Sequence, residues 1–278
     1  MNFLIKLFEF LTGTMSRPTN YGWFHLMFVA ITVVASVLMC VFLRNAKERT
    51  VRIICFGMWL LIAVLEVYKQ IVFTYNLEGG QFVADYQWYA FPFQLCSTPL
   101  YVLPFVAFLP DGKLRDAVTA YMIAFSIFGG ICVYIFPNDV FVETVGINIQ
   151  TMIHHGIQIV SGVFLAARYR DRLNIKYYLK GAAVFGVMLT VALILNLTVP
   201  KALAAAGLTD EFSMFYVSPY YPCHLPVLSI FYPIVPFPVF LIIYAVGFVV
   251  AAAVIFYIAK GVTLLCRAIG KALVKNAA

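Results

Sequence analysis

The stretch GWFHLMFVAITVVASVLMCVFLRNAKERTVR (22–52) decides the fold of this chain. Its first 22 residues contain no Lys, Arg, Asp or Glu, and its end carries Arg44, Lys47, Arg49 and Arg52. An apolar run of this length crosses a hydrocarbon core of about 30 Å as a helix. Basic residues directly after such a run mark the cytoplasmic side of a membrane. This stretch therefore predicts a membrane-spanning helix that runs from outside to inside.

The same pattern recurs along the chain. Of its 278 residues, 63% are hydrophobic and 11% are charged, whereas an average soluble domain carries about 25% charged residues. We therefore expect an all-α polytopic membrane protein in the cell membrane, folded as a single domain over residues 1–278. Hydrophobic length predicts seven transmembrane helices, at residues 22–43, 53–75, 90–109, 116–136, 147–167, 178–199 and 236–259.

Two hydrophobic regions do not fit a spanning helix. Residues 1–18 are apolar with one Lys and one Glu in the first fifteen, and no small-residue cleavage site follows, so we expect an interfacial amphipathic helix. Residues 201–235 contain Pro219, Pro222, Pro226 and Pro233. Each interior proline removes a helical hydrogen bond, which predicts an outer loop or a re-entrant segment.

Charge predicts the orientation of the spans. The loops after the first, third and fifth spans and the C-terminal tail together hold 15 of the 19 Lys and Arg residues. The positive-inside rule then places the N-terminus outside and the C-terminus in the cytoplasm. The net charge of +7 is explained by these loops and by contacts with lipid headgroups. We expect membrane lipids as partners and no nucleic acid, while the sequence leaves the oligomeric state open.

Polar residues inside the predicted spans are the strongest functional signal, because ionisable side chains in hydrocarbon are costly and mark functional sites. The predicted topology brings those of several spans to one layer, about 6–14 Å below the outer interface. On the fifth span, the i, i+4 spacing of His154 and Gln158 places both on one helical face. The residues expected in the layer are Glu66, Lys69, Gln94, Cys96, Cys132, Asn148, Gln150, His154, His155 and Asn196, with His25 near the outer end of the first span.

Cysteine and histidine at one depth predict acyl transfer. A histidine can take the proton of the Cys96 thiol and later give it to a leaving group. Polar donors such as Gln94, Asn148 or Lys69 can stabilise an oxyanion. We therefore expect Cys96 as nucleophile, His154 or His155 as base, and a lipid ester as substrate.

Other interpretations remain open at this point. Glu66 and Lys69, at i, i+3, form a structural pair or take part in a proton-coupled transporter or a lipid- or small-molecule-binding protein. A receptor-like module rests on helix number alone. Zinc-type ligands are present in Glu66, Cys96, His154 and His155, but no HExxH or CxxC spacing occurs, so we expect no metal and no other cofactor.

Four segments carry a resemblance to a known family. FPFQLCSTPLYVLPFVAFLP (91–110) resembles the Cys-bearing segment of YwaF-like bacterial integral membrane proteins, and INIQTMIHHGIQIVSGVFLAARYR (147–170) is similar to the His-bearing helix of that family. LEVYKQ (65–70) and VSPYYPCHLPVLSIFYP (217–233) fit its bacterial members too. The family includes the eukaryotic transmembrane protein 164.

The resemblance implies a seven-helix fold and, from the eukaryotic relative, a Cys- and His-dependent acyltransferase that acts on phospholipids. The family Cys matches Cys96, and the family His matches His155, with His154 as the alternative. Gln94 stands where many members carry His, which leaves open what assists Cys96. Glu66, Lys69, Asn148 and Gln158 are then expected to support the site.

Overall fold

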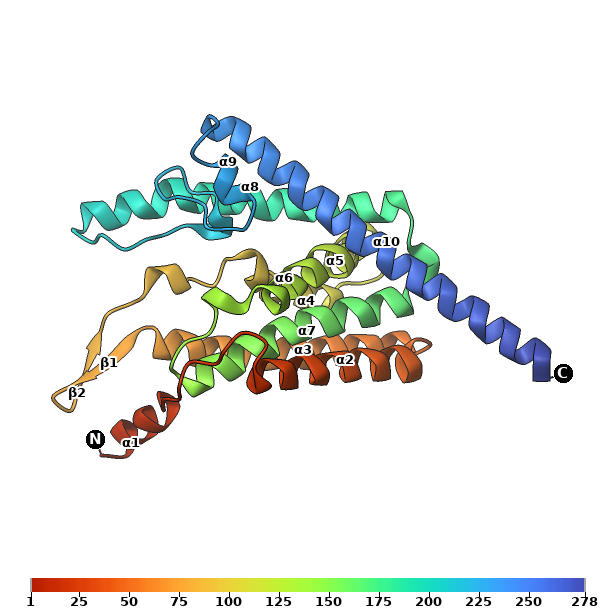
Figure 1. Cartoon of the computed structure of the whole chain (residues 1–278), viewed down its shortest axis with the longest axis horizontal. Helices are drawn as coiled ribbons and strands as arrows, with labels where there is room; N and C mark the ends of the chain where they lie inside the picture. Colours follow the sequence, from red (N-terminus) through yellow and green to blue (C-terminus); the bar gives the residue numbers. More distant parts are fainter. Residues whose placement is uncertain (1, 278) are drawn as a thin grey trace.

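The computed structural model describes residues 2–277, and the side chains of residues 3–138 and 140–265. Most of the chain is helical (Figure 1). The α-helices are α1 (Asn2–Leu11), α2 (Trp23–Leu43), α3 (Glu48–Val72), α4 (Pro99–Phe108), α5 (Lys113–Tyr121), α6 (Ile127–Ile135), α7 (Val145–Arg168), α8 (Ile175–Ala205), α9 (Leu228–Phe231) and α10 (Phe237–Ala277).

Within the part of the chain that the structure describes, five helical stretches are long and apolar enough to cross a membrane, which agrees with a polytopic membrane protein. α5 and α6 form one of them, because the π-helical turn η3 (Met122–Ser126) joins them without a break. α7 has 24 residues, but one side of it carries buried polar residues. The five stretches are Trp23–Leu43, Glu48–Val72, Lys113–Ile135, Ile175–Ala205 and Phe237–Leu265.

The structure differs from the predicted continuous helix over residues 90–109. Only α4 is α-helical there, and its ten residues are preceded by the 3-10 turn η2 (Leu95–Ser97). Pro92 and Pro99 explain the difference, because proline lacks an N–H group and disfavours helical geometry in the residue before it. Cys96 consequently lies on a short turn ahead of the helix.

A small β-hairpin is an addition that the all-α prediction missed. β1 (Tyr75–Glu78) pairs with β2 (Gln81–Ala84) in antiparallel register. Gly79 and Gly80 join the strands and both have positive φ, as a tight two-residue turn requires.

The main hydrophobic core lies between the central helices α4 to α7 and the α8 and α10 helices that cover them. Phe125 of η3 stacks on Phe185 of α8 with ring centroids 4.7 Å apart, and Phe185 stacks on Phe248 of α10 at 5.9 Å. α2 buries only Phe24, His25, Phe28 and Thr32. Its remaining surface is largely apolar and exposed, as expected of a helix that faces lipid.

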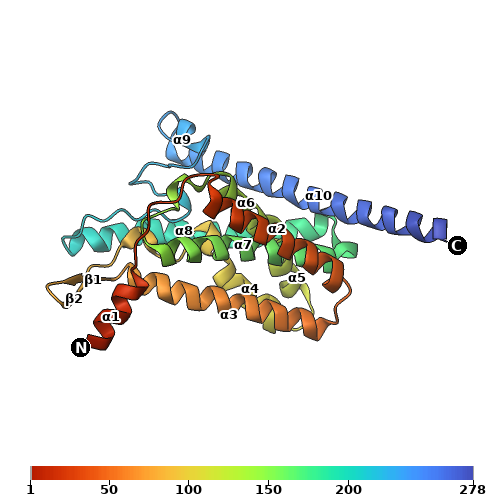
Figure 2. The ribbon, with the colours of Figure 1, turned by 60° about the horizontal axis from the view of Figure 1, so that its bottom comes forward.

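The two ends of the bundle carry different structures. The N-terminus and the hairpin lie at one end, while α10 extends past the other helices at the opposite end (Figures 1 and 2). Near that second end, Arg168 Nε donates to Ala46 O at 2.8 Å, and Arg52 Nη1 donates to Ala107 O at 3.2 Å. These contacts place the C-terminal ends of α2, α4 and α7 and the start of α3 close together.

Candidate functional site

Cys96 lies against α7 and is held there by two side chains of that helix. His154 Nε2 lies 2.8 Å from the Cys96 carbonyl oxygen, and Gln158 Nε2 lies 2.7 Å from the same atom. A carbonyl oxygen only accepts, so both nitrogens donate. The structure therefore brings together the residue types that the sequence proposed, through the backbone of Cys96.

Close packing of α6 on α7 supports this arrangement. A Cβ atom on Gly130 of α6 would lie 2.8 Å from the backbone oxygen of His155, and one on Gly129 would lie 3.3 Å from Gln158 Oε1. Real Cβ atoms almost never approach as closely as the first of these distances. Glycine at 130 thus allows α6 to sit directly on the part of α7 that carries the histidines.

The hydrogen bonds of the two imidazoles leave one nitrogen of each ring unused. His155 Nδ1 lies 2.7 Å from Thr151 O and donates to it, just as His154 donates through Nε2. His154 Nδ1 and His155 Nε2 are buried and have no hydrogen-bond partner among the described residues. In the neutral rings, both atoms carry a free lone pair, as a general base requires.

Glu66 and Lys69 form an ion pair beside this cluster, with Glu66 Oε1 and Lys69 Nζ 2.9 Å apart. Gln70 Nε2 also donates to Glu66 Oε1, at 2.7 Å, and Tyr86 OH donates to Gln70 Oε1 at 2.8 Å. Both charges of the pair lie close enough to interact electrostatically with Cys96. Glu66 Oε2 is buried and has no hydrogen-bond partner in the described part of the chain.

The side chains of Gln94 and Asn148 do not hydrogen-bond to Cys96, and both bind non-helical backbone instead. Gln94 donates to Ser213 O at 2.8 Å and accepts from the Phe215 N–H at 2.7 Å. Asn148 accepts from the Val142 N–H at 2.9 Å and donates to Val142 O at 2.7 Å. Each amide thus uses both its oxygen and its nitrogen to hold a non-helical segment.

Asn196 of α8 has the same role, which sequence reasoning missed. It donates to Met214 O at 2.9 Å and accepts from the Met214 N–H at 2.7 Å. With Gln94 it holds the turn η6 (Met214–Tyr216), in which Phe215 is buried and has positive φ. The signal available in the sequence was the proline-rich segment itself, because buried irregular backbone needs polar side chains as partners.

The described residues contain no group of three or more His, Cys, Asp or Glu side chains placed to hold a metal ion. Cys96, Cys132 and Cys223 do not form disulfides with one another. The groups that gather around Cys96 are its own thiol, the imidazoles of His154 and His155, and the adjacent ion pair of Glu66 and Lys69.

The TMEM164 family model matches residues 16–259. This chain belongs to the TMEM164 family. The match includes the turn that carries Cys96 and the whole of α7, so the site lies within the part that defines a TMEM164 family member. No curated protein and no solved structure matches the chain.

Proposed function

We propose that this TMEM164 family member transfers acyl chains between membrane lipids, with Cys96 as nucleophile and an imidazole of α7 as base. The observation that carries the proposal is the hydrogen bond from His154 to the Cys96 carbonyl, next to two imidazole nitrogens without partners. Thiols need such a base, because the free thiol has a pKa of about 8.5 and only the thiolate attacks.

The first half-reaction acylates the protein. The Cys96 thiol gives its proton to an imidazole nitrogen, and the thiolate adds to the carbonyl carbon of a phospholipid ester. The ester C–O bond then breaks, and the imidazolium returns the proton to the leaving oxygen. The products are a thioester on Cys96 and a lysophospholipid.

The second half-reaction releases the acyl chain. The hydroxyl of a second lipid gives its proton to the imidazole while its oxygen attacks the thioester carbonyl. The C–S bond breaks, and the sulfur takes the proton back. An acyl chain thus moves from one oxygen to another with no net oxidation or reduction.

The remaining predicted residues take supporting roles in this proposal. Gln158 helps hold the Cys96 peptide, and Lys69 supplies positive charge near the reacting carbonyl. Gln94 and Asn148 hold the backbone around the site.

The proposal includes a topology with seven crossings in the cell membrane. The N-terminus lies outside, the C-terminus is cytoplasmic, and Cys96 lies in the outer half of the bundle. Residues 1–18 then lie in the outer interface, and residues 201–235 form an outer loop or re-entrant segment. The clustering of the basic loops after α2, α4 and α7 supports this topology.

Replacement of Cys96 tests the proposal. Purified protein in liposomes receives a phospholipid with an isotope-labelled acyl chain and an unlabelled acceptor lipid, and mass spectrometry follows exchange. We expect Cys96→Ala to lower the rate about 10³-fold or more, while Cys132→Ala on α6 leaves it unchanged. Undiminished exchange by Cys96→Ala contradicts the proposal.

The variants His154→Ala and His155→Ala then show which of the two histidines acts as the base. The substitution that removes the base lowers the rate by about 10²–10⁴-fold. An acyl-thioester on the Cys96 peptide, seen by mass spectrometry in the wild type and lost in Cys96→Ala, identifies the intermediate.

A second candidate is proton-coupled transport, favoured by the ion pair of Glu66 and Lys69 beside two titratable rings. Proton-linked flux in proteoliposomes that Glu66→Gln abolishes and Cys96→Ala leaves intact supports this candidate over acyl transfer. Flux that survives Glu66→Gln removes its basis.

A further inference from the structure

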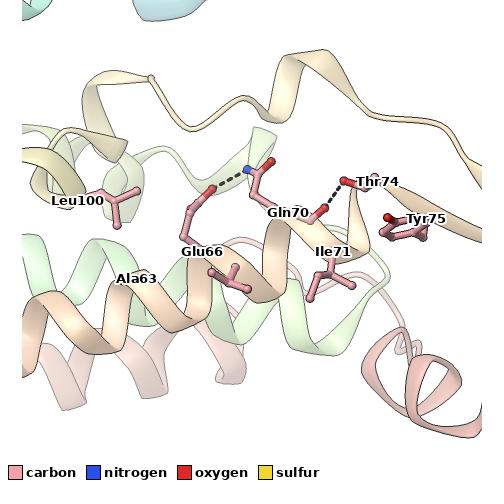
Figure 3. A pocket seen from close by; sticks show the side chains of 8 residues that line it. Ala63, Glu66, Gln70, Ile71, Thr74, Tyr75 and Leu100 are labelled. Atoms are coloured by element: carbon pink, nitrogen blue, oxygen red, sulfur yellow. Dashed lines mark hydrogen bonds between the residues drawn. The ribbon is translucent and has the colours of Figure 1, made fainter. Parts of the chain in front are cut away.

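The segment around Cys96 is held in place at several of its backbone carbonyl groups. Two side chains of α7 donate to the Cys96 carbonyl, and Trp59 Nε1 of α3 donates to Leu100 O at 2.9 Å. Figure 3 shows the side chain of Leu100 beside α3, near Glu66. The helices α7 and α3 thus each fix one point of this segment.

The carbonyl of Leu95, directly before Cys96, lacks the partner that an α-helix would give it. In an α-helix the N–H of residue 99 would donate to this oxygen, but Pro99 has no N–H. Thr98 supplies the donors instead, through its N–H at 3.3 Å and its Oγ1 at 2.6 Å from Leu95 O. The Thr98 hydroxyl therefore makes the shorter of the two bonds that close the turn η2.

Tyr121 fixes the direction of that hydroxyl bond. Tyr121 OH lies 2.6 Å from Thr98 Oγ1. A hydroxyl has a single hydrogen, and that of Thr98 is used on Leu95 O, so Tyr121 is the donor in this contact. Both side chains are fully buried, so water does not compete for either bond. Two hydrogen bonds in series thus lead from Tyr121 through Thr98 to the turn that carries Cys96.

The ring of Tyr121 is itself held by its neighbours. Tyr121 is the last residue of α5 and directly precedes the π-helical turn η3. Its ring stacks on Phe125 of that turn with centroids 5.4 Å apart, and Phe125 stacks in turn on Phe185 of α8. Single π-helical turns within α-helices are frequent at functional sites. Tyr121 consequently presents its hydroxyl from a ring that packing keeps in place.

We propose that Tyr121 is a positioning residue for Cys96, acting through Thr98 on the turn η2. Side chains of α7 hold the Cys96 carbonyl, while Tyr121 and Thr98 hold the carbonyl before it, and together these bonds set where the thiol lies relative to α7. The inference rests on the proposed acyl transfer by Cys96. Position matters to such a reaction, because a displacement of about 1 Å can lower a rate by about 10²-fold.

The test removes the two hydroxyl groups one at a time. Acyl exchange by purified full-length protein in liposomes is measured over a range of acceptor lipid concentrations. We expect Tyr121→Phe and Thr98→Val to lower kcat by about 10–100-fold and to leave KM within about twofold. Thr98→Ser keeps a hydroxyl, and we expect its kcat to stay within about threefold of the wild type. If Thr98→Ser loses as much activity as Thr98→Val, the hydroxyl is not the cause and the proposal is overturned.

Tyr178 of α8 offers a matched control in the same stack of rings. Its ring stacks on Phe125 at 6.2 Å, and its hydroxyl donates to Val249 O of α10. We expect Tyr178→Phe, which also removes a buried tyrosine hydroxyl, to change kcat less than about twofold. Equal losses in Tyr178→Phe and Tyr121→Phe overturn the proposal.

A double variant tests whether the two hydroxyls act in series. If Tyr121 acts through Thr98, the variant Tyr121→Phe, Thr98→Val has a kcat within about threefold of Thr98→Val alone. Losses that multiply in the double variant overturn this route.

Amide hydrogen exchange separates the inference from the proposed function, since it needs no acyl transfer. Mass spectrometry follows deuterium uptake by residues 95–103. We expect Tyr121→Phe to raise the rate of uptake there about tenfold, and Tyr178→Phe to change it less than about twofold. Unchanged uptake in Tyr121→Phe overturns the positioning role even where acyl exchange depends on Cys96. Raised uptake together with acyl exchange that survives Cys96→Ala contradicts the proposed function, and leaves the hold of Tyr121 on the turn confirmed.

Discussion

Glu48 and Glu66 lie near opposite ends of the same helix, α3, and their surroundings differ. Both oxygens of Glu48 have partners: the Tyr169 hydroxyl donates to them at 2.9 and 3.0 Å, and Arg115 and Arg168 form ion pairs with one oxygen each. Arg115 is itself buried, with 4% of its side chain exposed. Glu66 has partners on one oxygen only.

The difference separates a carboxylate with partners on both oxygens from one with partners on a single oxygen. Glu48 connects α3 with the loops after α4 and α7, because its partners come from α5 and from the end of α7. Buried charges of this kind are stabilised when every donor and acceptor is matched. Glu66 is held in place by Lys69 and Gln70, and its Oε2 is buried without a hydrogen-bond partner in the described part of the chain. The same helix thus carries one completed site and one incomplete site.

The largest expected difference between the two carboxylates is in the stability of variants that replace their charged side chains with uncharged ones. Glu48→Gln leaves the buried Arg115 guanidinium with Asp111 as its remaining carboxylate partner, and we expect the free energy of unfolding to fall by about 2–3 kcal/mol. We place this below the full range for buried pairs because 31% of the Glu48 side chain is exposed. The double variant Glu66→Gln, Lys69→Met replaces the pair with neutral groups, and we expect a change within about 1 kcal/mol.

Unfolding in mixed micelles with increasing SDS, followed by tryptophan fluorescence, measures both variants. A double variant that is as unstable as Glu48→Gln would show that Glu66 is structural too.

Close helix packing near the site gives a smaller effect. Gly130→Ala would put a methyl group 2.8 Å from the backbone oxygen of His155, and backbone cannot move aside as a flexible side chain can. We expect a loss of about 1–3 kcal/mol in the free energy of unfolding and a disproportionate loss of acyl exchange, because α7 shifts relative to Cys96.

Gly57→Ala on α3 is the matched control, since no atom lies within 4 Å of a Cβ placed there. We expect this substitution to stabilise the protein by about 0.5–1 kcal/mol through helix propensity. If Gly130→Ala behaves like Gly57→Ala, close contact between α6 and α7 is not what positions the histidines.

The sequence predicted the features that depend on local patterns, such as apolar length and helical spacing. Apolar length predicted α2 over 22–43, and the structure has it at Trp23–Leu43. Burial of the polar residues of α7, including His154, His155 and Gln158, followed from their helical spacing. The sequence predicted Cys96 and the polar residues of α7 at one depth but left open whether they touch, and the hydrogen bonds of His154 and Gln158 to the Cys96 carbonyl supply that contact.

The remaining features depend on tertiary contacts that no local pattern specifies. The prediction of a helix over 90–109 followed apolar length and did not take Pro92 and Pro99 into account, and the α-helix starts only at Pro99. Gln94 was expected near the reacting atoms, but its amide holds η6, a segment more than a hundred residues away in sequence. Which oxygen of Glu66 lacks a partner depends on the packing of Gln70 and Tyr86, and no sequence pattern records that.

Substitutions of two tyrosines are expected to have the smallest effects. Each tyrosine hydroxyl belongs to the hydrogen-bond network of one of the two compared carboxylates. Tyr169 donates to Glu48 directly, whereas Tyr86 reaches Glu66 only through Gln70. Burial raises the pKa of each phenol to about 12. The unfolded phenols titrate near pH 10, so between pH 10 and 12 the unfolded chain binds fewer protons and stability falls as the pH rises.

At neutral pH we expect Tyr169→Phe to cost about 1.5–2 kcal/mol, because it removes a donor from a charged group, and Tyr86→Phe about 0.5–1 kcal/mol, because its acceptor is a neutral amide. Each substitution also reduces the loss of stability between pH 10 and 12, since one titrating phenol is gone. SDS unfolding across this pH range measures both effects. If Tyr86→Phe lowers the free energy of unfolding as much as Tyr169→Phe does, the hydrogen bond from Tyr86 to Gln70 stabilises Glu66 as strongly as the direct bond from Tyr169 stabilises Glu48. The hydrogen-bond networks at the two ends of α3 would then be equally strong, despite the unpaired oxygen of Glu66.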